Sequence, residues 1–313
     1  MSRTSILRGP CKMTFNTKVF YSKGDVVVNY IQELTPLQTS RFGKVGDSVS
    51  SVMAQIEFEP DGRWLSAALS TMLPFNTKTI GSSVFGADSA LTINSVDGKK
   101  TVFTAAAVTT KKQTLRLGIK ETIFGPMQFT ALYGAAKDPT DADALVTFSD
   151  ESYPGDANFD RADILKQAYD IAWSGKSAPW DAFMAKDDIN IAIDLDLTPE
   201  TSQSHGIFDY IFGGMQASAT FEPDGPTSIE AVEAALLQDT GAALGRCATS
   251  QGAHLNISGT GVYIRLYNAA PVNPKERYSA KLRRMGVLEW RASRSQTTGT
   301  IDPLIYVGAS APA

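Results

Sequence analysis

The pentapeptide Phe-Glu-Pro-Asp-Gly occurs twice in this chain of 313 residues, at 58–62 and at 221–225. The two copies are 163 residues apart, and Leu-Thr-Pro at 34–36 recurs at 197–199 with the same spacing. Words shared at one spacing without a gap indicate an internal duplication, and a repeat constrains the fold of the whole chain. The alternative is that the pentapeptide is a common connection between a strand and a helix that this chain uses twice.

Apolar and polar residues alternate in the segments that lead into the two pentapeptides. The residues on the apolar faces are Val52, Ala54, Ile56 and Phe58 in one copy and Met215, Ala217, Ala219 and Phe221 in the other. A period of two is typical of a half-buried strand. Proline and glycine end a strand, and Asp61 or Asp224 suits the N-terminal cap of a following helix. Each copy is therefore predicted to contain a strand, a turn and a helix.

Each copy also has an earlier predicted strand, at 25–34 in the first copy and at 189–198 in the second. A long segment separates this earlier strand from the strand that leads into the pentapeptide. The segments at 37–50 and 200–213 are predicted to be loops, and loops of this length are usually functional. The second contains Phe208, Tyr210 and Phe212, which are too apolar to remain in water. We predict that these three residues, with Phe42 in the first loop, contact another subunit. The alternative is that the second loop folds back over its own core.

The pattern predicts a mainly β fold with flanking helices (α+β), made of two tandem β-sandwich or barrel domains. We expect an N-terminal arm at 1–24, a first domain at 25–135, a linker at 136–185 and a second domain at 186–313. The linker is expected to contain an amphipathic helix at 160–173, with apolar residues at helical spacing.

Composition gives no sign of an enzyme, a cofactor or a metal site. The net charge is −4, which does not favour a basic surface that wraps nucleic acid. Cys11 and Cys247 lack the spacing of a disulfide framework or a zinc site, and His205 and His254 suggest no catalytic arrangement. No stretch approaches the ~20 apolar residues that a membrane helix needs. We expect a soluble protein from a reducing compartment, with no catalytic, cofactor or metal residues.

The strongest charge feature is a basic cluster in the second copy. It consists of Lys275, Arg277, Lys281, Arg283 and Arg284, with a weaker counterpart at Lys111, Lys112 and Arg116. Such a cluster is usually a solvated hairpin. The alternative is one half of an electrostatic subunit contact.

The order strand, long loop, strand, helix and further strands, repeated around the pentapeptide, resembles the tail tube proteins of tailed bacteriophages. The resemblance covers 25–134 and 186–295 and is strongest to subunits that fuse two tube domains. It implies a six-fold ring of tube domains, hence trimeric (pseudo-hexameric) rings, stacked into a conduit for DNA ejection. It also implies a location in the virion tail after assembly in the host cytoplasm. The implied partners are other copies of the chain, tail tip or baseplate proteins and tail terminator proteins, with tape-measure protein and genomic DNA passing through the lumen.

In such a tube the channel wall would face polymerised DNA, which carries one negative charge per ~1.7 Å of its axis. A basic wall would bind DNA and stall ejection, so acidic side chains are expected there. The polar faces of the paired strands supply Glu33, Glu57, Asp194 and Asp196. Two alternatives remain at this point: a phage baseplate hub or distal tail protein, and a two-domain β binding module or enzyme unrelated to phages.

Overall fold

The computed structural model of the chain describes residues 2–85, 89–120, 122–132, 145–154, 167–175, 180–202, 206–224, 253–272, 276–278, 283–294 and 303–312. Strands predominate among these residues, which confirms a mainly β fold. The helices described are α1 (Leu65–Ser70) and two short 3-10 helices, η1 (Gly62–Trp64) and η2 (Leu73–Thr77).

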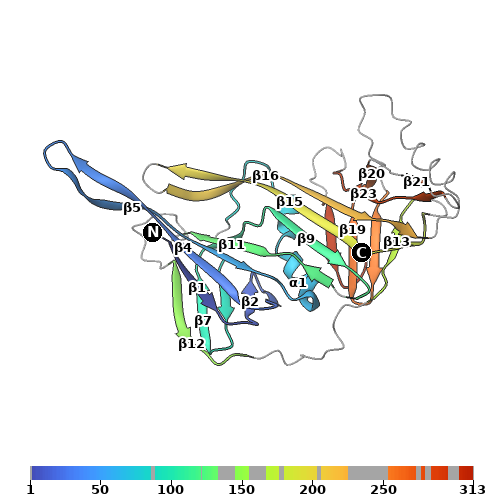
Figure 1. The fold of residues 1–313 in the computed structure, drawn as a ribbon, viewed down its shortest axis with the longest axis horizontal. Helices are drawn as coiled ribbons and strands as arrows, with labels where there is room; N and C mark the ends of the chain where they lie inside the picture. The colour runs from blue at the N-terminus through green and yellow to red at the C-terminus, as the bar shows by residue number, and fades with distance from the viewer. Residues whose placement is uncertain are drawn as a thin grey trace.

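Two five-stranded sheets form what we call the first half of the molecule (Figure 1). One sheet contains, in spatial order, β1 (Ser2–Leu7), β4 (Val26–Thr39), β5 (Gly43–Phe58), β11 (Met127–Leu132) and β8 (Ala106–Val108). The other contains β12 (Val146–Asp150), β7 (Lys99–Phe103), β6 (Leu91–Asn94), β2 (Lys12–Phe15) and β3 (Lys18–Tyr21). The rings of Phe15 and Phe129 meet edge to face at 4.9 Å, so the two sheets pack against each other around an apolar core.

Two six-stranded sheets form the second half. The first contains β10 (Thr122–Phe124), β9 (Lys112–Leu117), β15 (Ile189–Ser202), β16 (Gly206–Phe221), β23 (Leu288–Arg291) and β20 (Ala270–Val272). The second contains β17 (Pro223–Asp224), β14 (Phe183–Ala185), β13 (Asp170–Trp173), β18 (Leu255–Gly259), β19 (Val262–Leu266) and β24 (Ile305–Gly308). The rings of Trp173 and Trp290 join these sheets at 4.8 Å. A further hairpin is formed by β21 (Glu276–Tyr278) and β22 (Arg283–Met285).

The two halves share several measured features. The hairpin β15–β16 begins and ends 163 residues after the hairpin β4–β5. The register shifts after Glu33 and Leu37 in β4, and after the corresponding residues Asp196 and Glu200 in β15. Corresponding rings also stack, Phe58 on Phe129 at 6.0 Å and Phe221 on Trp290 at 6.2 Å. Strand order, bulge positions and aromatic packing therefore agree between the halves.

The boundaries expected for the arm and the linker need correction. Residues 2–24 are not an arm, because they supply β1, β2 and β3, and Met13 and Phe20 are completely buried. The helix expected at 160–173 is wrong at its end, where Asp170–Trp173 forms β13, while 155–166 lies outside the described residues. Ile171 fits the helical stripe predicted from Ile164, Leu165 and Ala168, but it also forms a period of two with Trp173, and pairing with β18 decides in favour of a strand.

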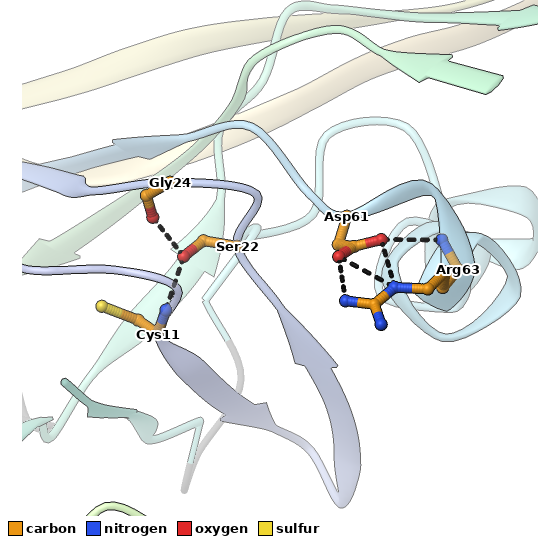
Figure 2. A network of polar contacts seen from close by, with 5 residues as sticks. All are labelled: Cys11, Ser22, Gly24, Asp61 and Arg63. Atoms are coloured by element: carbon orange, nitrogen blue, oxygen red, sulfur yellow. Dashed lines mark hydrogen bonds and ion pairs between the residues drawn. The ribbon is translucent and has the colours of Figure 1, made fainter. Parts of the chain in front are cut away.

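The pentapeptide ends a strand in both halves, as predicted, since β5 ends at Phe58 and β16 at Phe221. The carboxylate of Asp61 accepts a hydrogen bond of 3.0 Å from the backbone N–H of Arg63 and caps η1 (Figure 2). The same figure shows the Ser22 hydroxyl accepting from the backbone N–H of Cys11, at the start of the β2–β3 hairpin. The helix expected after Asp224 lies outside the described residues.

The Trp290 side chain is expected to be a main source of stability in the second half, because it is completely buried between the two sheets. Trp290→Ala should lower the free energy of unfolding by about 3–5 kcal/mol. Trp290→Phe should cost less, because it keeps a ring and removes an indole N–H that has no acceptor among the described residues. Urea unfolding of both variants tests this, and equal losses would contradict the assignment.

Candidate functional site: two long hairpins and an added strand

The two long segments predicted as loops are instead the outer parts of long β-hairpins. β4 pairs with β5 from Val27 opposite Glu57 to Thr39 opposite Gly43, so the connection is only 40–42. β15 pairs with β16 in the same way, out to Ser202 opposite Gly206. Pairing satisfies the backbone groups along both arms, which a loop of this length would leave to water. Both hairpins project from the body in the same direction (Figure 1).

The β15–β16 hairpin packs against the first half of the same chain. The backbone N–H of Val84 donates to the carbonyl of Tyr210 at 2.7 Å, and that of Phe212 donates to the carbonyl of Ser82 at 3.0 Å. The ring of Phe212 lies 5.5 Å from that of Phe75. The second hairpin is therefore held by a segment of the first half, through both hydrogen bonds and aromatic packing.

This placement changes the interpretation of the aromatic residues predicted at a subunit interface. Phe212 is completely buried and has no surface for another subunit, so its partner is Phe75 of the same chain. Tyr210 and Phe208 are half-buried, and burial raises the pKa of Tyr210. Phe42 is 72% exposed at the tip of the β4–β5 hairpin. Of the four, Phe42 alone is largely free for a contact outside the chain.

Some apolar side chains are exposed on the β4–β5 hairpin, whereas the residues at the corresponding positions of the β15–β16 hairpin are more buried. Leu34 is 37% exposed, whereas Leu197, 163 residues later, is 4% exposed. Val45 is 55% exposed, whereas the corresponding Phe208 is half-buried. Together with Leu37 and Phe42, these side chains form what we call the hairpin patch (Leu34, Leu37, Phe42 and Val45). Several exposed apolar side chains on one projecting hairpin suit a contact with another chain.

The sheets of both halves carry an added strand on the same edge. β1 pairs with 26–31 of β4, and β9 pairs with 189–194 of β15, which are the same six positions 163 residues later. β9 follows β8 of the first half, so its pairing with β15 ties the two halves together. Its alternate residues Gln113, Leu115 and Leu117 are buried.

Asn76 provides another connection between the halves. Its amide oxygen accepts hydrogen bonds from the backbone N–H groups of Leu304 and Ile305, at 3.0 and 3.2 Å. Its amide nitrogen donates to the carbonyl of Ile305 at 2.7 Å. The side chain is 4% exposed, so η2 is fixed firmly to the start of β24.

The acids predicted to face a channel lie on the polar faces of their strands. Glu57 and Asp196 are exposed and Asp194 is half-buried, while the side chain of Glu33 lies outside the described part. This face also carries bases, since Lys112 lies directly opposite Asp194 and Arg116 forms an ion pair with Asp188. The weaker basic cluster therefore lies where β9 joins β15, among acidic partners.

No group of three His, Cys, Asp or Glu side chains suited to a metal ion occurs among the described residues. The Nδ1 atom of His254 accepts a hydrogen bond from the backbone N–H of Asn268 at 3.1 Å, and burial lowers the pKa of its imidazole. A hollow of about 190 Å³ lies beside η2, and Lys78 is the charged residue among the described residues that line it; burial lowers the pKa of that amine. In the part of the chain that the structure describes, no helix has the length and apolar character needed to cross a membrane.

Comparison with known proteins found no family model and no curated protein sequence that matches this chain.

Phe212 and Phe42 provide a direct test of these assignments. Phe212→Ala should lower the free energy of unfolding by about 3–5 kcal/mol, because it empties a buried site between the halves. Phe42→Ala should change it by less than about 0.5 kcal/mol, because the ring is mostly in water. Denaturant unfolding measures both free energies. A Phe212→Ala variant as stable as the native chain would mean that Phe212 is not buried between the halves.

Proposed function

We propose that this chain is the structural subunit of a phage tail tube. In this proposal it consists of two duplicated tube domains and assembles as stacked trimeric, pseudo-hexameric rings that conduct DNA during ejection. The chain acts by binding copies of itself, and it carries no catalytic role.

The duplication is supported by the agreement between the halves. The long hairpins have the same length and the same two register shifts at corresponding residues. Corresponding polar contacts also recur, because Lys23 lies beside Glu59 as Lys186 lies beside Glu222. Bulges are conserved features of related folds, so equal positions favour common descent over a chance reuse of strands.

The observation that carries the proposal is the hairpin patch. Within the chain, the first half covers the β15–β16 hairpin, and the corresponding side chains of the β4–β5 hairpin remain exposed. A neighbouring chain that presents its second half to the β4–β5 hairpin would cover the hairpin patch in the same way. A head-to-tail contact of this kind generates a closed ring when its rotation closes. Three chains with two domains each give the six-fold arrangement.

The polar faces of β5 and β15 suit the wall of such a channel. Glu57 and Asp196 are exposed there, and the apolar residues between them, such as Ile56 and Leu195, are buried in the cores. Exposed acids repel the phosphates of passing DNA and prevent the adhesion that basic groups would cause.

Electron microscopy of the purified protein is expected to show trimeric rings stacked into tubes. The double variant Leu37→Asp with Val45→Asp should remain folded but fail to assemble, because both changes place charge in the hairpin patch. Val96→Asp is the matched control, since Val96 is also an exposed apolar residue (42%) but lies in the turn between β6 and β7. Monomers of the native chain would overturn the proposal, and single closed rings would indicate a hub protein.

The channel wall is tested by replacing Glu33, Glu57, Asp194 and Asp196 with Lys. Tubes should still form, and DNA release from particles that carry the variant should be slow or blocked, because lysines bind phosphates. Release is measured by the fluorescence of a DNA dye after receptor addition. Normal release from particles with intact tubes would place these side chains outside the lumen.

A further inference from the structure

The two added strands differ in how firmly they are packed. β9 buries every second side chain against the core of the second half. β1 occupies the same register on β4, yet none of its described side chains is fully buried, and Ile6 is 61% exposed. β1 therefore covers the backbone edge of β4, and the side chain by which it packs against the core is the half-buried Leu7.

The hairpin β21–β22 corresponds in chain position to the hairpin β9–β10. β9–β10 lies between β8 and β11, and β21–β22 lies between β20 and β23. In both hairpins four residues connect the two strands, and in both the next strand begins three residues after the hairpin ends. This register makes Arg277 the counterpart of Arg116.

The two hairpins have different environments in the single chain. β9 adds to the edge of β15, whereas β21 and β22 pair only with each other among the described residues. The edge that corresponds to the β15 edge lies on β4, where β1 occupies it. β21 lies at the far side of the second half from β1 and cannot reach that edge within one chain (Figure 1).

We propose that β1 is an exchangeable strand. In the single chain it covers 26–31 of β4, and in the ring the β21–β22 hairpin of a second copy replaces it there. The incoming hairpin would bind as β9 binds to β15 within the chain. This inference rests on the proposed function, because it specifies the contact through which one subunit receives the next.

A corresponding pair of charges supports this exchange. On the second half, Arg116 of the added strand forms an ion pair with Asp188, just before β15. The counterpart of Asp188 is Asp25, just before β4, whose carboxylate accepts a hydrogen bond from the backbone N–H of Gly9 at 2.8 Å. Gly9 follows β1, so loss of β1 frees Asp25. Arg277 of the incoming copy would then be its partner.

The exchange would replace part of the backbone hydrogen bonding of the edge. An uncovered edge strand is a template for uncontrolled pairing. β1 removes that hazard before assembly, and the three residues of β21 correspond to Leu115–Leu117 of β9, so they would pair with 26–28 of β4. Ring formation would then depend on the additional contacts that the second copy makes, including those to the hairpin patch.

A disulfide that locks β1 in place tests the exchange directly. Thr4 and Asn29 lie opposite each other, with 2.8 Å between Oγ1 and Oδ1, so Thr4→Cys with Asn29→Cys suits a disulfide. The full chain also carries Cys247→Ser, and Cys11 is buried with its thiol pKa raised to about 12, which limits competing disulfides. The oxidised variant should remain monomeric, and a reductant should restore tubes. Thr14→Cys with Thr92→Cys, opposite each other on β2 and β6, is the control and should form tubes in both states.

A charge exchange tests the contact between the copies. Arg277→Asp and Asp25→Arg should each lower assembly at least tenfold, and the two changes in one chain should restore it. The strand exchange would be wrong if the oxidised Thr4→Cys, Asn29→Cys variant formed tubes, or if the Arg277→Asp, Asp25→Arg variant failed to regain assembly. Either result would leave the tube proposal intact. A native chain that never assembles would overturn both.

Discussion

The open edge of a β-sheet is the constraint on which the rest of this structure depends. An edge strand presents unpaired N–H and C=O groups, and these must be covered if the edge is not to pair with other strands at random. Here β1 covers the edge of β4, and β9 covers the corresponding edge of β15 at the same register. Because β9 belongs to the first part of the chain, covering this edge also brings the β9–β10 hairpin into a six-stranded sheet of the second half.

The apolar faces of the long hairpins, like the open edges, need to be covered by another part of the protein. The β15–β16 hairpin is covered by a segment of the first half, which packs Phe75 against Phe212, and Leu197 of the same hairpin is also buried. The β4–β5 hairpin has the same length and bulges, yet it leaves Leu34 and Val45 exposed. One chain contains a single first half, so it can cover only one of its two hairpins. In the proposed ring, the contact inside the chain would serve as the template for the contact between chains.

Local patterns predicted those parts of the fold that depend on neighbouring residues. The alternation around Ile56 and Ala217, the strand end at Phe58 and the cap at Asp61 are confirmed. The short strands in 1–24 and 170–185 were missed, because three to six residues carry too little periodicity. The outer hairpin arms were missed because their pairing depends on a partner strand. The burial of Phe212 could not be predicted locally, since Phe75 lies far away in the sequence.

Charge follows from this arrangement of edges. Asp194 lies opposite Lys112, and Arg116 pairs with Asp188, so bases and acids meet where an added strand joins a sheet. Glu57 lies opposite Val27 and Gln128, which are uncharged, and its carboxylate is not neutralised by a directly opposite residue. Bases thus meet acids where β9 joins β15, whereas Glu57 lies between uncharged neighbours in the middle of its sheet. In the proposed ring, the β21–β22 hairpin would lie between chains and would bring Arg277, Arg283 and Arg284 of the basic cluster to a subunit contact, away from passing DNA.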